Sequence, residues 1–434
     1  MQKTTWSGYI EKKFPELKDD IECDVLVVGG GLCGILCAYK LHELGKNVVL
    51  LEMNNICGKK SLKTTATITA IEDIMYYDLI DKIGEDNAKL YLEANLYALN
   101  EYRKLSKKYD FDFEECPSYK YSKIDDGMIE KESKAIKSLG YNTSIKQHID
   151  IPINIAKALE FKNQGQMNPL KLVNELVNDL TIYENSKVVK VQENCAYTET
   201  NSVKFKDIVI TTGYPFLKLK GLFFLKMYQK KSHVVEVSDN HGCKGNGVGV
   251  SDDDIYFRNY NNSVLLGSSD ERTGYDCNGF EKINQLIVSK YDVRKVKNRW
   301  INIDAITLDG MPYIGRYTKN SEHIYIATGF NMWGMTKSLL ASHIISDLIV
   351  NKENRFTKLF SPCRKMLFKP LIKNIGFAVK EMVKLKKKRC SHLGCPLFFN
   401  EVDNTYECRC HGSKYNLDGH ILDTPAQNNK DFRD

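Results

Sequence analysis

Four residues near the end of the chain have the types and the spacing of a metal centre. Cys390 and His392 stand one residue apart, and Cys408 and His411 follow with two residues between them. Thiolates and imidazoles are ligands that proteins offer to zinc and to iron–sulfur clusters. Zinc fingers pair like residues, as in C-x₂₋₄-C and H-x₃₋₅-H, whereas each short motif here supplies one Cys and one His.

These spacings resemble those of Rieske centres, in which two thiolates hold one iron of a 2Fe–2S cluster and two imidazoles hold the other. The resemblance implies that the two Cys and two His residues above are the cluster ligands. It also implies a disulfide between Cys395 and Cys410, which stand where Rieske proteins of the respiratory type carry one. Zinc bound by the same residues, and structural cysteines without a ligand, remain as alternatives.

A glycine-rich turn near the N-terminus could hold a dinucleotide. Gly29, Gly31 and Gly34 form G-x-G-x-x-G between the apolar run 25–28 and a helical pattern, and Glu52 ends the next apolar run. Such glycines allow a tight turn, close approach of a pyrophosphate and close helix–strand packing. The helix N-terminus attracts phosphate, and Glu52 is placed to bind ribose hydroxyls. The alternative is a turn without ligand, and the motif alone does not separate FAD from NAD.

Four collinear segments resemble the D-amino-acid-oxidase-type flavoproteins over roughly residues 20–360. They are the glycine turn, Lys63–Ala66, Asp309–Gly315 and Ala327–Thr336. The resemblance implies an extended FAD, with its adenine beside the glycine turn and Glu52. It also implies a helix beginning near Gly334 whose N-terminus points at the flavin, where its dipole would stabilise negative charge. The further cofactor-binding residues that the resemblance implies are Thr65, Ala66, Asp309, Gly329, Gly334, Met335 and Thr336.

Candidate catalytic residues come from the antiparallel sheet that roofs the flavin in this family. Arg258 and Arg272 are the basic residues in the corresponding stretch, and either guanidinium could hold a substrate carboxylate through paired hydrogen bonds. A surface arginine is the alternative for each. We expect Arg258 and Trp333 at the catalytic site, with a packed aromatic as the alternative for Trp333. We expect His233 to be structural.

The elements that must position these residues follow from hydrophobic periodicity. Apolar runs at 25–28, 48–51, 207–213 and 323–329 predict strands, residues 335–350 predict a helix, and period-two alternation at 230–270 predicts an antiparallel sheet. The expected fold class is α/β. It combines a Rossmann-like FAD-binding domain, an antiparallel-sheet substrate domain and a small Rieske β subdomain.

The expected division of the chain is discontinuous. The FAD-binding domain takes residues 1–85, 168–215 and 300–360, and the substrate domain takes residues 86–167 and 216–299. A basic helical linker at 361–389 runs almost directly into Cys390, without the strands that usually precede the first ligand loop. The Rieske subdomain, 390–434, is therefore expected to be truncated and to depend on its metal, its disulfide or docking, because a piece this small seldom folds alone.

The composition limits the function classes. The chain has 434 residues, is 42% hydrophobic and 27% charged, and has a net charge of +7, which is ordinary for a globular protein. It has neither a long apolar run nor a signal-peptide pattern, so we expect a cytoplasmic protein without a transmembrane segment. The mild positive charge gives no reason to expect nucleic acid.

These features together predict an FAD-dependent oxidoreductase. We expect it to oxidise a small amine or amino-acid-like substrate by hydride transfer to flavin and to pass single electrons through the cluster. The outside acceptor would be a one-electron protein or a quinone-like molecule. The alternative is an electron-transfer protein without small-molecule turnover, which would use the basic run at 384–389 to dock its partner; a solvated linker is the simpler interpretation of that run.

Overall fold

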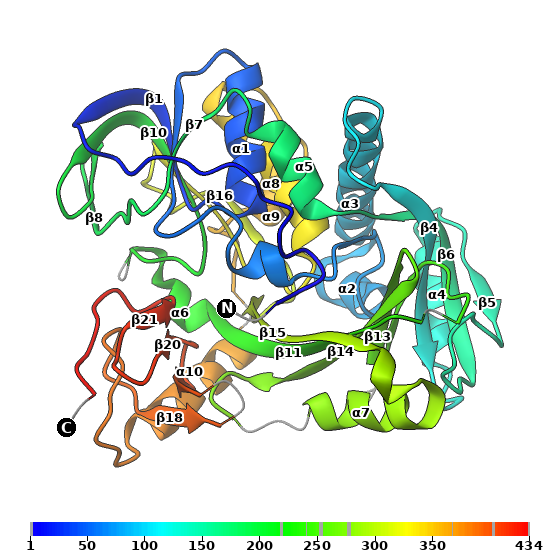
Figure 1. Cartoon of the computed structure of the whole chain (residues 1–434). Coiled ribbons are helices and arrows are strands. Elements are labelled where there is room, and N and C mark those ends of the chain that lie inside the picture. Colours follow the sequence, from blue (N-terminus) through cyan, green and yellow to red (C-terminus); the bar gives the residue numbers. More distant parts are fainter. Residues whose placement is uncertain are drawn as a thin grey trace.

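Figure 1 shows a chain that forms three β-sheets, with helices packed around the two larger ones. The α/β architecture expected from the sequence is confirmed. The computed structural model describes residues 3–217, 220–239, 241–250, 255–275, 279–366, 368–401 and 404–432.

The first sheet has the order β16-β17-β10-β1-β2-β7, and its central strands are parallel. Residues 25–28 of the central strand β1 are all apolar because alternate side chains enter two different cores: Val25 and Val27 face one, and Leu26 and Val28 face the other. The strands are β1 (Ile21–Val28), β2 (Val48–Leu51), β7 (Thr181–Tyr183), β8 (Lys190–Gln192), β9 (Cys195–Tyr197), β10 (Ser202–Gly213), β16 (Tyr313–Arg316) and β17 (Ile324–Thr328).

Helices α1 and α8 pack against each other beside this sheet, and α5 packs on α1. The turn between β1 and α1 therefore lies close to the first residues of α8, although about 300 residues separate them in sequence. The helices of this half are α1 (Leu32–Glu43), α5 (Pro169–Leu176), α8 (Gly334–Ile349) and α9 (Thr357–Phe360), with the short 3₁₀ helix η1 at Lys60–Lys63.

The second sheet has the order β15-β11-β14-β13-β12-β4-β6-β3, and all its pairings except β12–β4 are antiparallel. Its strands are β3 (Thr67–Ile68), β4 (Glu114–Ser122), β5 (Ser144–Lys146), β6 (Lys157–Gln166), β11 (Met227–Val237), β12 (Asn246–Gly249), β13 (Ile255–Tyr260), β14 (Ser263–Arg272) and β15 (Val296–Thr307). Its helices are α2 (Tyr76–Ile83), α3 (Glu85–Ser106), α4 (Met128–Ser138), α6 (Phe223–Lys226) and α7 (Gly279–Lys290), with 3₁₀ turns η2 (Lys220–Leu222) and η3 (Val293–Lys295).

The sheets divide the chain almost as expected. All strands of the first sheet lie in the ranges assigned to the FAD-binding domain. However, β3 and β15, both partly or wholly inside those ranges, pair in the second sheet. The domain ranges therefore remain a proposal.

A third, small sheet follows the helix α10 (Phe368–Met382). It consists of β18 (Leu397–Asn400), β19 (Thr405–Cys408), β20 (Lys414–Tyr415) and β21 (Ile421–Asp423), in that order. Four of the eight buried residues in its core are cysteines. Figure 1 shows this sheet beside α6 and one end of β11. The part of the chain that forms the two larger sheets, called the larger half of the molecule, therefore packs against the small sheet.

Within the described residues, no helix combines the length and the apolar character needed to cross a bilayer.

Candidate functional site

The glycine turn joins β1 to α1 at the carboxyl end of the first sheet. Gly29 has a φ of +112°, and a Cβ there would lie 2.9 Å from the carbonyl carbon of Thr211. A Cβ at Gly34 would lie 1.9 Å from the carbonyl oxygen of Gly29. Only glycine at these two positions lets α1 approach the turn this closely, which directs the helix N-terminus into a cleft.

Glu52 closes one end of this cleft. Its carboxylate accepts the backbone N–H of Gly30 at 2.7 Å and that of Asn54 at 2.9 Å. Burial raises the pKa of Glu52. The acidic side chain is thus fixed beside the glycine turn, with Gly29, Gly31 and Glu52 all lining the cleft.

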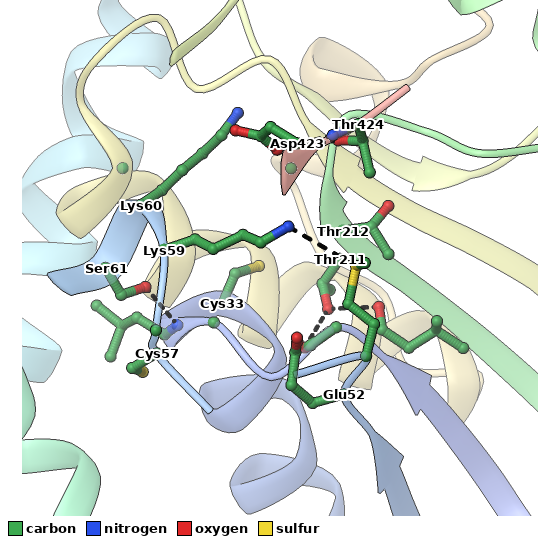
Figure 2. A pocket seen from close by; sticks show the side chains of 18 of the residues that line it. Cys33, Glu52, Cys57, Lys59, Lys60, Ser61, Thr211, Thr212, Asp423 and Thr424 are labelled. Atoms are coloured by element: carbon green, nitrogen blue, oxygen red, sulfur yellow. Dashed lines mark hydrogen bonds between the residues drawn. The ribbon is translucent and has the colours of Figure 1, made fainter. Parts of the chain in front are cut away.

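Two lysines that sequence reasoning missed extend into the same cleft. Lys59 and Lys60 stand just before and within η1, and Figure 2 shows Lys60 extending toward Asp423 of the C-terminal sheet. The next residue, Ser61, accepts the N–H of Leu32 at 3.0 Å and so caps the start of α1. Two cations beside a helix N-terminus suit a phosphate-containing ligand.

The cleft ends at the start of α8, where Gly334 and Met335 line it. The approach to α8 is unusual because Asn331 and Met332 have φ values of +52° and +73°. Asn331 is pinned there, since its side-chain oxygen accepts the N–H of Thr307 at 2.8 Å. This pinned turn fixes where α8 begins relative to the cleft.

The Lys63–Ala66 segment forms the wall between this cleft and a second cavity. Each of its four carbonyl oxygens accepts a side-chain hydrogen bond. Trp300 donates to residue 63 at 2.8 Å, Trp6 donates to residue 64 at 2.6 Å, and Arg258 donates to residues 65 and 66. Ala66 has a φ of +59°. Three large buried side chains thus hold the wall in a strained conformation.

The second cavity has a volume of about 300 Å³ and lies on the other side of that wall. It joins the first cleft, because five residues line both. Its other walls come from β4, β12, β13 and the Trp333 turn. The shared residues are Thr64, Asn302, Asp304, Met332 and Met335.

Lys120 of β4 points into this second cavity. Its side chain is fully buried, and its Nζ has no hydrogen-bond partner among the described residues. The Nζ lies 4.5 Å from the centre of the Trp333 ring, in cation–π contact. Burial lowers the pKa of Lys120 to about 8. An unpaired buried cation is costly to keep, so Lys120 is a candidate for binding an anionic group.

Asp304 of β15 stands where the cleft and the cavity meet. Its Oδ2 accepts a hydrogen bond from Asn302 at 3.0 Å. Burial raises the pKa of this carboxyl group. The junction therefore carries a group with a perturbed pKa, which is common at catalytic sites.

The four residues expected to bind the cluster are all buried in and beside the C-terminal sheet. The rings of His392 and His411 lie 4.9 Å apart, and all four side chains are at most 7% exposed. The Cys390 sulfur accepts hydrogen bonds from Tyr415 and from the N–H of His392, both at 3.4 Å. Hydrogen bonding to Cys408 lowers the pKa of Cys390 to about 6.

The buried imidazole of His411 has the properties of a metal ligand. Its Nδ1 is buried without a hydrogen-bond partner among the described residues. Burial, with a smaller effect of His392, lowers the pKa of His411 to about 3, so the ring is neutral as a ligand must be. The edge of Phe224 packs on both imidazoles, at 6.0 and 6.3 Å between ring centres.

Cys395 and Cys410 meet beside the ligands. Their sulfurs and that of Cys408 all lie within 4.8 Å of one another, and both are free thiols in the structure. The disulfide between Cys395 and Cys410 stays a prediction.

The cluster loops are tied to the larger half of the molecule by buried polar contacts. Gln229 of β11 donates to the carbonyl oxygens of His411 and Thr424, at 2.9 and 2.8 Å, and accepts from Lys60 at 3.1 Å. Glu407, fully buried, pairs with Lys231 of β11 at 3.3 Å. Four of the five residues in the segment 423–427 consequently line the first cleft.

Comparison with known proteins identifies both halves. The profile of the family described as FAD dependent oxidoreductase (DAO) matches residues 24–348. The chain belongs to this FAD dependent oxidoreductase family. The profile of the Rieske [2Fe-2S] domain matches residues 374–432, and so begins inside α10 rather than at residue 390. The expected combination of an FAD-dependent oxidoreductase domain and a Rieske domain is confirmed.

Individual relatives resemble either the whole chain or its FAD-dependent part. The Bacillus subtilis (strain 168) "Putative Rieske 2Fe-2S iron-sulfur protein YhfW" is 28% identical over 95% of this chain and 94% of its own. Gamma-glutamylputrescine oxidoreductase of Escherichia coli (strain K12) is 26% identical over 79% of this chain and 87% of its own. Glycine oxidase from Geobacillus kaustophilus shares the fold, with a TM-score of 0.67, 17% identity, and coverage of 80% of this chain and 100% of its own.

The residues present fit both cofactors of this FAD-dependent, Rieske-containing oxidoreductase. The glycine turn, Glu52 and the two cleft lysines suit an adenine dinucleotide. The unpartnered His411 Nδ1 and the two thiols suit a His- and Cys-ligated cluster.

Several residues expected to bind FAD do not line the first cleft. Thr65 lines the second cavity instead. Asp309 forms a two-point ion pair with Arg364, at 2.7 and 2.8 Å. Thr336 is buried and hydrogen-bonded to the backbone of Thr69.

Three small residues expected to bind FAD contribute through their size or backbone conformation. Gly34 and Gly329 stand where a Cβ would clash with neighbouring atoms, and Ala66 has a positive φ. We assign these residues to shaping the site rather than to direct contact.

The expected substrate-binding arginines are occupied elsewhere. The Arg258 guanidinium holds the carbonyls of residues 65 and 66 and does not line the cavity, so we assign it to the wall and not to a substrate carboxylate. Arg272 stacks between Tyr228 and Phe377 and donates to Asn374. His233 is buried against Phe280. Trp333 is the predicted catalytic residue that does line the cavity.

Proposed function

We propose that this protein oxidises a small amine or amino-acid-like substrate and passes the electrons singly through its Rieske cluster to an outside acceptor. One observation carries the proposal. The cleft that fits FAD opens on one side into the Lys120 cavity and is lined on another by residues 423–427 of the Rieske domain. When bound, FAD supplies acceptance of a hydride and the 2Fe–2S cluster supplies one-electron transfer.

Lys120 is proposed to position the substrate. Its ammonium group is buried, has a pKa of about 8 and makes no hydrogen bond among the described residues. The charges of Asp73, Glu72 and Glu132 favour it only from a distance, so a substrate carboxylate would supply a direct counter-ion. Trp333, which covers the Nζ, would exclude water and pack on the substrate's apolar part. The names of two similar proteins, glycine oxidase and gamma-glutamylputrescine oxidoreductase, point to the same class of amino compound.

Asp304 is proposed to take the proton that an ammonium substrate must lose before it is oxidised. Its raised pKa makes it a stronger base than an exposed aspartate. Asn302 holds the carboxylate in a fixed orientation at the junction of cleft and cavity.

Gln229 is proposed to fix the cluster loop relative to the FAD cleft. It bonds both Lys60, which lines the cleft, and the carbonyl of His411, which belongs to the cluster loop. A fixed separation suits electron transfer within the chain. The outside acceptor is proposed to be a one-electron protein or a quinone-like molecule.

The test is anaerobic addition of primary and secondary amines, with and without a carboxylate, to protein purified with both cofactors. We expect at least one carboxylated amine to bleach the oxidised-flavin absorbance, and its analogue without the carboxylate to act far more slowly. If none of the panel bleaches the flavin while a reduced one-electron protein does, the chain is an electron-transfer protein and the proposed substrate class is wrong.

A further inference from the structure

Helix α10 has an inverted amphipathic pattern. Its outward face is apolar: five large hydrophobic side chains in the helix and two more in the three residues that follow it are exposed by 37% to 93%. A helix of a globular protein normally turns such a stripe toward the core. These seven are Phe368, Ile372, Ile375, Val379, Met382, Val383 and Leu385. Below they are called the α10 stripe.

The inward face of α10 is held by polar contacts. Its two buried residues are Asn374 and Glu381. Asn374 donates to the carbonyl of Leu225 at 2.9 Å and accepts from Arg272 at 2.5 Å. Glu381 accepts from Lys384 and from Tyr275, at 2.6 and 3.3 Å. Rotating the helix to bury the stripe would break these bonds, so the exposed orientation is fixed.

Every exposed charged side chain of the segment 368–389, which carries the stripe, is positive. The single acidic residue between 364 and 389 is Glu381, and it is 1% exposed. The exposed basic side chains on and after the helix are Lys369, Lys373, Lys380, Lys386 and Lys387. An apolar stripe with a rim of lysines is typical of helices that lie in the interface of an anionic membrane.

We propose that α10 docks the protein on an anionic lipid surface. The stripe would enter the boundary between headgroups and acyl chains, and the lysines would contact the headgroup charges. Because the exposed charges of this segment are all positive, two copies of the chain docked through it would repel each other. This favours an anionic lipid surface as the partner over a second copy of the chain. At 1.5 Å per residue, the 15-residue helix offers a contact line of about 22 Å. The surface lies on the membrane without crossing it.

The docking surface is next to the cluster. The Cys410 thiol lies 3.9 Å from the carbonyl of Ala378 in α10. Docking would therefore bring the Rieske domain to the lipid surface, where lipid-soluble electron acceptors dissolve. This inference goes beyond the proposed function and does not depend on which substrate the protein oxidises.

The first test is co-sedimentation of the full-length protein, with both cofactors, with vesicles. One set contains phosphatidylglycerol mixed with phosphatidylcholine, and the other contains phosphatidylcholine alone. We expect binding to the anionic vesicles, weakened by salt, and little binding to the neutral ones. Replacing Lys386 and Lys387 by Gln should weaken binding about fivefold per residue. Equal binding to both vesicle types, or none to either, would overturn the proposal.

The second test compares two double variants with matched exposure. V379E/V383E changes stripe residues that are 54% and 71% exposed, and V288E/V293E changes distant surface valines that are 71% and 53% exposed. We expect the first pair to abolish vesicle binding and the second to leave it unchanged, with flavin absorbance and circular dichroism normal in both. If V379E/V383E instead abolishes a dimer seen by light scattering and the wild type binds no vesicles, the stripe is an interface between two copies.

Discussion

The FAD cleft and the cluster centre use different parts of the chain to hold their cofactors. The cleft is formed largely by backbone, through the glycine turn and the starts of α1 and α8, and it stands on two extensive hydrophobic cores. The cluster centre is formed by side chains, and its own core has eight buried residues of which four are cysteines. Glu407, Gln229 and Phe224 tie it to the larger half.

This difference implies two kinds of dependence on cofactor. We expect the FAD half to keep its packing whether or not the dinucleotide is bound, because it buries two extensive hydrophobic cores of its own. The Rieske half is too small to bury much apolar surface, so ligand bonds supply folding energy there. A substitution in one half should therefore affect mainly the cofactor that this half holds.

Replacing Gly34 by Val should abolish FAD binding. The added Cβ would lie 1.9 Å from the carbonyl oxygen of Gly29, so α1 must move away from the turn. The measurement is flavin content after purification. Gly376, where a Cβ meets no atom within 4 Å, provides the matched control as G376V. Normal flavin in G34V would show that the turn does not position the dinucleotide.

Replacing Cys408 by Ser should remove the cluster and loosen the C-terminal sheet while FAD stays bound. Iron and acid-labile sulfide should fall to background, and limited proteolysis should cut after α10 in the variant alone. Cys363, a free cysteine outside the cluster, gives the control C363S. A protease-resistant C408S tail without iron would contradict the claim that the cluster stabilises this sheet.

Replacing Lys120 by Met should lower activity and raise stability at neutral pH. Burial lowers the pKa of the Lys120 ammonium from its ordinary value of 10.5 to about 8, so below pH 8 the folded protein must bury a charge that its surroundings disfavour. For the wild type, stability therefore rises as pH increases from about 8 to 10.5, because the unfolded chain then binds more protons. The K120M variant should lack this pH dependence, and its free energy of unfolding at pH 7 should exceed that of the wild type by up to about 3 kcal/mol.

The functional readout separates Lys120 from a packing residue. With the carboxylated amine found active, kcat/KM of the wild type should fall above pH 8, mainly because KM rises. In K120M, kcat/KM should be lower and should not show this fall. K120R should restore part of the binding. An unchanged KM in K120M would show that Lys120 does not bind the substrate. A gain in stability without a change in KM would mean that Lys120 has only a structural role.

Replacing Tyr415 by Phe should produce the smallest change, a lower reduction potential of the cluster. Its hydroxyl donates to the Cys390 sulfur at 3.4 Å, and hydrogen bonds to cluster sulfurs stabilise the reduced state. Loss of one bond of about 1 kcal/mol corresponds to about 40 mV for one electron. A redox titration followed by EPR measures it, with Y406F as control. An unchanged potential would mean that the bond does not reach the metal-bound sulfur.

Local patterns were enough to predict the parts of the site that are contiguous in sequence. The glycine turn and each of the two Cys–His pairs expected to bind the cluster are recognised from spacing within a few residues, and Glu52 from its place at the end of the next strand. Lys120 was missed because nothing in the local sequence SYKYS (residues 118–122) marks it; its burial arises only when β4 lies between β12 and β6. The contacts of Arg258 could not be predicted because its partners, the carbonyls of residues 65 and 66, are nearly 200 residues away.

Helix α10 shows a second limit. Its spacing predicted a helix, but the usual rule places the apolar face inside, whereas here Asn374 and Glu381 are the buried residues. Their partners, Leu225 and Tyr275, come from the body of the protein. Which face a helix buries is decided by such distant partners, and one sequence does not reveal them.

The central claim is that FAD and cluster exchange electrons within one chain during substrate oxidation. Rapid mixing of the protein with its amine substrate under anaerobic conditions, followed by freeze-quench EPR, tests it directly. The account predicts that the reduced-cluster signal, with the low average g value of His-ligated clusters, grows as the flavin bleaches, at a rate independent of protein concentration. Flavin bleaching with an oxidised cluster, or a rate proportional to protein concentration, would contradict it.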